Sequence, residues 1–249
     1  MLTIVVPAHN EAGKIGKTLQ TLLSTSAVDS IVVITNGCTD TTDAEITSLN
    51  SSKIKVYNYA EQLGYDIPRA LGAEQALAEK SDYIGFVDGN MQYSGLVESM
   101  SILTTDMEKY DLSLVEVMSS NPTRWSPALK IIAYLNREIG LGNTVVTTTC
   151  PPFIISRKAL LGMSLADVAV PPMMLAKTFQ NKYTIKVVGK VSYGTIKNAI
   201  VTGDKRNKIS DTIIGDCAEA ISYLKGKRER PVIYDGYNSQ RDFNILKGV

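Results

Sequence analysis

The chain is poor in the residues that mark disulfide-stabilised and zinc-binding proteins. It has three cysteines among 249 residues, widely spaced as Cys38, Cys150 and Cys217, and it has no Cys-x-x-Cys pair. An odd number of widely spaced cysteines indicates neither a disulfide framework nor a structural zinc site. This pattern favours a reducing environment, so we expect a cytoplasmic protein.

Long apolar runs and an excess of one charge are also missing. No window approaches the roughly 18 apolar residues that span a membrane, and the first apolar run, Leu2–Val6, is too short for a signal peptide. Lysine and arginine number 26 against 25 acidic residues, which gives a formal net charge of +1. A balanced chain has no global attraction to nucleic acid or to an anionic membrane. Any anionic ligand must therefore meet a local site.

The first part of the chain alternates short apolar runs with helical patterns. The 44% hydrophobic and 20% charged composition is ordinary for a globular protein of this length. We expect strands at 2–6, 30–34, 53–58 and 82–87, and helices at 11–23, 41–49 and 67–78. This rhythm predicts an α/β fold, with a mainly parallel sheet and helices on both faces. Such sheets bind ligands at the carboxyl ends of their strands.

The second part of the chain is less regular. It predicts strands near 112–117 and 183–189, a loop at 121–127, a short helix from 157, helices at 128–139, 172–179 and 211–224, and mixed signals over 142–156. We find neither an internal repeat nor a low-complexity linker. We therefore predict a single domain over 1–249, with a nucleotide-binding half at 1–110 and an acceptor-binding half at 111–249.

Three polar clusters follow expected strands. They are PAHNE at 7–11, TNGCTDTT at 35–42 and DGN at 88–90. One such cluster alone would be a loop with a helix cap. Three clusters at successive strand ends favour a ligand site, because loops on one edge of a sheet form one crevice.

The segments that carry these clusters, taken in order, resemble the GT-A fold, family 2 glycosyltransferases. The segments are TIVVPAHNEAGKIGKTL, DSIVVITNGCTDTT and YIGFVDGN, and the resemblance covers about residues 3–100. It implies a single α/β domain that moves a hexose from a UDP- or GDP-sugar to an acceptor hydroxyl, assisted by a divalent metal. The sequence leaves the acceptor open among a sugar, a lipid-linked molecule and a polymer. It also leaves open whether the protein forms a homo-oligomer.

The resemblance assigns nucleotide-sugar-binding roles to the three strand ends and to the third helix. In the family, the first loop wraps the nucleoside and the second contacts the base and ribose. The residues assigned in this way are Pro7, Ala8, Asn10, Glu11, Asn36, Asp40, Arg69 and Asp88. Arg69 could pair with a phosphate, since a guanidinium fork suits its oxygens. The alternative is an arginine on a helix surface.

The DGN cluster matches the metal-binding DxD motif of the family. Asp88 and Asn90 would hold Mn²⁺ or Mg²⁺, hard cations that take oxygen ligands and neutralise a leaving diphosphate. Asn90 stands where a second aspartate is usual, so it offers an amide oxygen without charge. The alternative for Asp88 is a capping turn at the end of the strand.

The acceptor half departs further from the family pattern. A Glu-Asp pair often opens a helix there and supplies the general base, but Pro171 and Pro172 stand at about that place. Asp167 is the nearest carboxylate and our candidate catalytic residue. Two alternatives remain open: the enzyme retains the anomeric configuration and needs no such base, or the protein binds a sugar nucleotide without turnover. A nucleotidyltransferase is a further alternative, although the glycine-rich phosphate loop of that class is missing.

Overall fold

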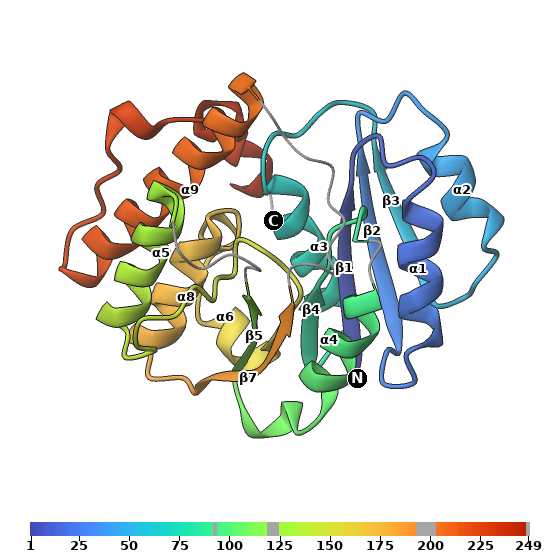
Figure 1. Ribbon diagram of the computed structural model, residues 1–249. Helices are drawn as coiled ribbons and strands as arrows, with labels where there is room; N and C mark the ends of the chain where they lie inside the picture. The colour runs from blue at the N-terminus through green and yellow to red at the C-terminus, as the bar shows by residue number, and fades with distance from the viewer. Residues whose placement is uncertain (92–93, 119–124, 193–202, 248–249) are drawn as a thin grey trace.

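The protein is built on one seven-stranded sheet with helices on both of its faces (Figure 1). The computed structural model describes residues 1–91, 94–118, 125–192 and 203–247. Most of the loop that we expect at 121–127 lies outside these residues. None of the described helices combines the length and the apolarity needed to cross a membrane.

The sheet is mainly parallel, as the sequence predicts. Its strands are β1 Leu2–Ala8, β2 Ser30–Asn36, β3 Ile54–Tyr59, β4 Tyr83–Phe86, β5 Leu112–Met118, β6 Phe153–Ser156 and β7 Ile185–Ser192. The spatial order is β3-β2-β1-β4-β6-β5-β7, and only β6 runs antiparallel to its neighbours. Because β6 lies between β4 and β5, the two expected halves share one continuous sheet.

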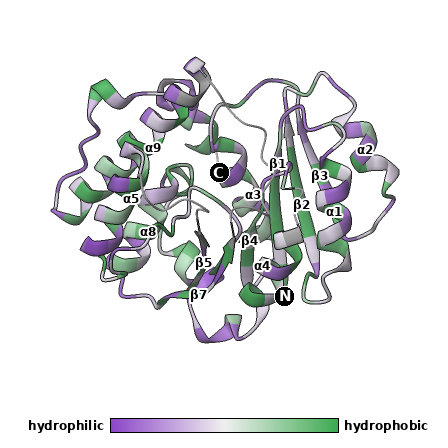
Figure 2. Ribbon diagram, viewed as in Figure 1, coloured by the Kyte–Doolittle hydropathy of each residue, from purple (hydrophilic) through white to green (hydrophobic). Residues whose placement is uncertain are grey.

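Two hydrophobic clusters fill the two faces of the sheet. One lies beneath α1, α2 and α4, and the other lies beneath α3, α5, α8 and α9. Hydrophobic residues run along β1, β2 and β4, whereas α5 and α9 mix hydrophobic and hydrophilic residues (Figure 2). The helices are α1 Ile15–Ser24, α2 Thr42–Ser48, α3 Ile67–Ala78, α4 Ser94–Thr104, α5 Pro127–Glu138, α6 Arg157–Leu161, α7 Leu165–Val168, α8 Pro171–Gln180 and α9 Gly203–Leu224.

The structure corrects several predicted element boundaries. The first helix begins at Ile15 instead of residue 11, because Asn10 and Gly13 have φ values of 54° and 76°, in the left-handed region. Helix α4 was not predicted, and α9 begins eight residues earlier than expected, at Gly203 instead of 211. Helix α3 agrees with the predicted bounds of 67–78.

Close packing of α3 on β1 sets the position of the site. A Cβ atom added at Gly72 would lie 2.2 Å from Val5 Cγ1, so the glycine lets the helix approach the strand. After α9 the chain runs through short 3₁₀ turns, η3 Val232–Tyr234, η4 Asn238–Gln240 and η5 Phe243–Lys247, and η5 returns to α3. The C-terminal segment therefore lies beside the start of α3. Because β2, β1 and β4 are consecutive in the sheet, their carboxyl ends are neighbours.

Candidate functional site

A cleft of ≈ 330 Å³ lies at the carboxyl ends of β1, β2 and β4. The start of α3 and the C-terminal segment close its remaining sides. The lining residues are Pro7, Ala8, His9, Glu11, Asn36, Gln62, Gly64, Tyr65, Asp66, Pro68, Arg69, Asp88, Gly89, Asn90, Thr149, Tyr237 and Gln240. The structure thus brings most of the residues singled out in the sequence into one cleft. Asn10, Asp40 and Asp167 are not among its lining residues.

Asn10 and Asp40 fasten the first strand-end loop to the second. The Asn10 side-chain oxygen accepts a hydrogen bond from the Thr39 amide at 2.8 Å, and Asp40 accepts one from the Ala12 amide at 3.1 Å. A further hydrogen bond from the Thr42 hydroxyl holds the pKa of Asp40 below its ordinary value. Neither side chain lines the cleft, so both support its edge by holding the two loops together.

Asn36 joins three segments at the floor of the cleft. Its side-chain amide donates to the Ala8 carbonyl at 3.1 Å and accepts from the Leu63 amide at 3.4 Å. The Asn36 carbonyl accepts from His9 Nδ1 at 2.7 Å. Asn36 is only 4% exposed, so it fixes the relative positions of β1, β2 and the segment before α3.

Glu11, Asp88 and Asn90 bring oxygen ligands together in the cleft. The Asn90 amide donates to Glu11 Oε1 at 2.9 Å, and Lys14 pairs with Glu11 Oε2 at 3.1 Å. The Asp88 side chain is 38% exposed and faces the cleft. Gly89 permits this arrangement, because an added Cβ would lie 3.0 Å from the Pro7 carbonyl oxygen.

These donors fit a hard divalent cation that arrives with further oxygen ligands. Carboxylate and amide oxygens are the ligands that Mg²⁺ and Mn²⁺ take, and Mg²⁺ is usually held by one or two carboxylates together with substrate phosphates. Among the described residues, no group of three or more histidine, cysteine, aspartate or glutamate side chains could hold a metal by itself. The oxygens of Glu11, Asp88 and Asn90 would therefore need further ligands, such as those of a diphosphate, to hold a cation.

Arg69 is buried between two aspartates. It is 4% exposed, and its guanidinium pairs with Asp88 Oδ1 at 3.1 Å and with Asp66 Oδ1 at 3.2 Å. Burial acts to lower the pKa of Arg69, but the two carboxylates outweigh it and raise the pKa above its ordinary value. The alternative of an arginine on the helix surface is therefore wrong.

The C-terminal segment supplies a part of the cleft that the sequence did not predict. Tyr237 and Gln240 line it together with Tyr65 and Asp66 from the turn before α3. The two tyrosine rings are stacked, with centroids 5.3 Å apart and planes inclined by 12°. A polar, turn-rich sequence carries no local pattern that would place these residues beside the strand ends.

Asp167 has contacts that tie it to helix α7. It is 2% exposed and forms a capping box with Ser164, accepting hydrogen bonds from the Ser164 amide at 3.0 Å and hydroxyl at 2.8 Å. Arg228 pairs with its other oxygen at 3.0 Å, and Lys177 lies 3.6 Å from Oδ2. These contacts agree with a structural role, and the role of general base stays a prediction.

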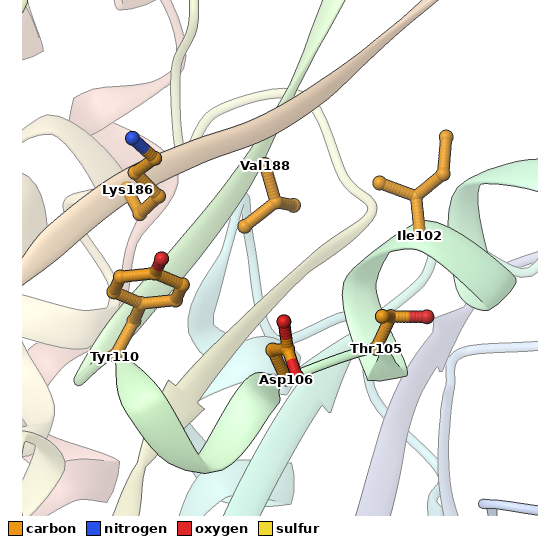
Figure 3. A pocket seen from close by; sticks show the side chains of 6 residues that line it. All are labelled: Ile102, Thr105, Asp106, Tyr110, Lys186 and Val188. Atoms are coloured by element: carbon orange, nitrogen blue, oxygen red, sulfur yellow. The ribbon is translucent and has the colours of Figure 1, made fainter.

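A second hollow, of similar volume, lies elsewhere on the molecule (Figure 3). It is lined by Ile102, Thr105, Asp106, Tyr110, Lys186 and Val188. Tyr110 precedes β5 and Lys186 is the second residue of β7, so this hollow opens toward the amino ends of those strands. The strand-end clusters lie at the opposite edge of the sheet, and we therefore assign the candidate site to the cleft.

The fold and the cleft define an α/β protein whose candidate ligand site lies at the carboxyl edge of a mainly parallel sheet. The model of the family described as Glycosyl transferase family 2 matches residues 3–161. The chain belongs to this family and is a glycosyltransferase, as the sequence predicts. The search of curated proteins found no match.

Solved structures of glycosyltransferases share the GT-A fold of this chain at low sequence identity. Glucosyl-3-phosphoglycerate synthase from Mycobacterium tuberculosis, in complex with Mn²⁺, UDP and glucosyl-3-phosphoglycerate, is 15% identical with a TM-score of 0.64. The match covers 92% of this chain and 81% of that one. S. aureus TarS 1-349 is 15% identical with a TM-score of 0.50, over 90% of this chain and 72% of that one.

Proposed function

We propose that the enzyme moves a hexose from a UDP- or GDP-sugar to an acceptor hydroxyl, and that Mn²⁺ or Mg²⁺ assists the transfer. The observation that carries this proposal is the meeting of Glu11, which follows β1, with Asp88 and Asn90, which follow the neighbouring strand β4, in one cleft. The M. tuberculosis enzyme with the same fold has been solved with UDP and Mn²⁺ and with UDP and Mg²⁺, which supports the choice of ligands.

The cleft offers different surroundings to the two parts of the donor, the nucleoside and the diphosphate. Pro7, Ala8 and Asn36 form its floor at the ends of β1 and β2, where the nucleoside would lie. Glu11, Asp88 and Asn90 would hold the divalent cation beside the diphosphate. When bound, such a cation supplies charge neutralisation for the leaving nucleoside diphosphate.

Arg69 would keep the Asp88 carboxylate oriented during turnover. The guanidinium lies 3.1 Å from Asp88 and is fixed from its other side by Asp66 and by the Thr148 carbonyl at 3.3 Å. A carboxylate held in this way cannot turn toward solvent without leaving a buried positive charge partly unpaired. Most of the catalysis would then come from positioning and from stabilisation of the leaving group.

The general base and the stereochemistry of transfer remain open within this proposal. The carboxylates that line the cleft are Glu11, Asp66 and Asp88, and each already contacts another polar side chain. Asp167 is the candidate base for an inverting reaction, although its capping box with Ser164 favours a structural role. Retention of configuration requires no such base.

Donor hydrolysis separates the proposed function from its alternatives. The protein would be incubated with Mn²⁺ and, in turn, with UDP-sugars, GDP-sugars and nucleoside triphosphates mixed with sugar phosphates. Release of free sugar supports a glycosyltransferase. Release of pyrophosphate supports a nucleotidyltransferase, and binding without any release supports a sugar-nucleotide-binding protein.

The cellular compartment is a further part of the proposal. Cys38, Cys150 and Cys217 are all free thiols, which supports a reducing, cytoplasmic location. The acceptor stays open among a sugar, a lipid-linked molecule and a polymer. Whether the protein forms a homo-oligomer also stays open.

A further inference from the structure

The C-terminal segment closes the cleft with an aromatic side chain. Tyr237 and Gln240 line the cleft, yet they lie well beyond residues 3–161, which the family model matches. We infer that Tyr237, stacked on Tyr65, is a nucleotide-binding residue whose ring supports the base of the donor, and that Arg241 is the positioning residue that holds it there. This inference rests on the proposed function, because it takes the cleft as the donor site.

The first contact that places the segment is a close approach of two backbones. Gly64 has a φ of +88°, and an added Cβ would lie 1.9 Å from the Gln240 carbonyl oxygen. Only glycine combines this conformation with this proximity. The turn before α3 and the C-terminal segment therefore pack directly against one another.

The second contact is the stack of Tyr65 on Tyr237. The rings are nearly parallel, with centroids 5.3 Å apart, and together they form an extended aromatic surface. Lys208 Nζ lies 5.9 Å from the centroid of the Tyr237 ring. Burial raises the pKa of Tyr65, so its hydroxyl stays neutral. Among the described residues that line the cleft, these are the only tyrosine, phenylalanine or tryptophan side chains.

The third contact is a buried ion network centred on Arg241. Its guanidinium binds both oxygens of Asp216 at 2.8 Å, and it also reaches Asp66 at 3.1 Å and the Tyr65 carbonyl at 3.1 Å. Asp216 lies on α9, and Arg241 is 5% exposed. Buried charges of this kind tolerate little displacement, because each must keep its partner. Arg241 thus fixes the segment to α9 and to the start of α3 together.

The surroundings of the aromatic surface indicate which part of the donor it meets. Gln62 and Gly64 continue the same wall, and the backbone of Gln62 packs on Gly37, where an added Cβ would lie 2.9 Å from the Gln62 nitrogen. Gly37 follows β2 directly, so this wall adjoins the end of β2. The candidate ligands for the cation beside the diphosphate follow β1 and β4. A flat base fits the surface of Tyr65 and Tyr237, since a base binds to an aromatic ring by stacking on it.

The test compares the binding of UDP with the binding of inorganic pyrophosphate, both with Mn²⁺, by calorimetry. In Tyr237→Ala, the affinity for UDP should fall by about tenfold, a typical loss for one stacked base, whereas the affinity for pyrophosphate should not change. Tyr237→Phe should restore most of the affinity for UDP. Tyr234→Ala removes a ring from the same segment outside the cleft lining, and it should bind UDP as the wild type does.

Variants that displace the segment test the positioning role. Gly64→Ala should lower the affinity for UDP at least as much as Tyr237→Ala, because the new methyl group meets Gln240. Gly140→Ala is the matched control, since Gly140 has a similar φ of +79° but nothing within 4 Å of the added carbon. Arg241→Lys keeps the charge without the fork, and it should weaken UDP binding while pyrophosphate binding stays unchanged.

Three results would overturn this inference and can be told apart. If the wild type binds UDP or GDP and Tyr237→Ala binds it equally well, Tyr237 is not a binding residue and the proposed function stands. If the wild type binds neither nucleotide at millimolar concentration, the proposed function fails and the inference fails with it. Equal losses for UDP and for pyrophosphate would show a general disturbance of the cleft, which contradicts a specific contact with the base.

Discussion

The two walls of the cleft are built in different ways. The wall at the ends of β1, β2 and β4 is held by hydrogen bonds among short loops, such as Thr39 to Asn10 and Asn90 to Glu11. The opposite wall depends on Arg241, which pairs with Asp66 across 175 residues of sequence. The first wall follows from strand order, because parallel neighbours end at one edge. The second follows from a buried charge network, which one residue can undo.

Removing Arg241 should have the largest effect on the molecule. Arg241→Met would leave Asp216 with only Arg230 and Asp66 with only Arg69. Loss of one partner from a buried pair costs about 3–5 kcal/mol, and the remaining partners place the expected loss at the lower end, about 3 kcal/mol. We expect the free energy of unfolding, measured with urea, to fall by that amount. Lys109→Met is the control, because the Lys109–Asp106 pair at 2.8 Å is exposed and such pairs contribute about 0–1 kcal/mol. Equal losses in the two variants would contradict the network.

Adding a charge at Asn90 should change how the wall at the strand ends binds a divalent cation. Asn90→Asp adds a carboxylate to the proposed cation site, and we expect Mn²⁺ to bind about tenfold more tightly in the presence of UDP, equal to about 1.4 kcal/mol. Asn90→Ala should bind Mn²⁺ more weakly than the wild type. Calorimetric titration of Mn²⁺ measures both. Unchanged affinity in both variants would mean that the DGN cluster is only a turn.

Asp167 lies outside both walls, and its substitution should affect stability more than chemistry. Asp167→Asn weakens the capping box with Ser164 and the pair with Arg228, so we expect a loss of about 1 kcal/mol in the free energy of unfolding. The rate of sugar transfer should stay within about twofold of the wild-type rate. A fall in turnover of about 10²- to 10⁴-fold, with unchanged donor affinity, would instead identify Asp167 as the general base.

The smallest effect should come from the hydroxyl of Thr42, which donates to Asp40 and accepts from the Glu11 amide at the ends of β1 and β2. In Thr42→Val the Asp40 carboxylate loses the hydroxyl that lowers its pKa, so the pKa should rise toward the ordinary value in an NMR titration. A lowered pKa stabilises the folded state above the ordinary pKa, and this contribution is lost as the pH falls through the lowered value. The variant should therefore lose less stability on acidification. Thr41→Val is the control, because Thr41 bonds to Glu45.

The contrast between the walls explains how far the sequence could predict this structure. The parallel sheet, the bounds of α3 and the gathering of Pro7, Asn36 and Asp88 follow from apolar periodicity and strand ends, which are local patterns. Helix α4 carries the buried residues Leu96, Met100 and Leu103 at helical spacing, so its pattern is also local.

The wall that the C-terminal segment forms could not be predicted, for a physical reason. Nothing in the residues around Tyr237 or Arg241 specifies that Asp66 and Asp216 lie beside them, since that proximity arises only when α9 packs on the sheet. Asn10 and Asp40 show the same limit on a smaller scale. The family resemblance assigned them to the nucleotide-sugar site, whereas in the structure their oxygens join two loops.

The central claim is that the cleft binds a nucleoside diphosphate together with a divalent cation at Asp88. Calorimetric titration of UDP and of GDP, with and without Mn²⁺, into the wild type and into Asp88→Ala tests it most directly. The account predicts that one nucleotide binds the wild type, that Mn²⁺ tightens this binding, and that Asp88→Ala loses the effect of Mn²⁺. It is contradicted if neither nucleotide binds, or if Asp88→Ala retains the wild-type response to Mn²⁺.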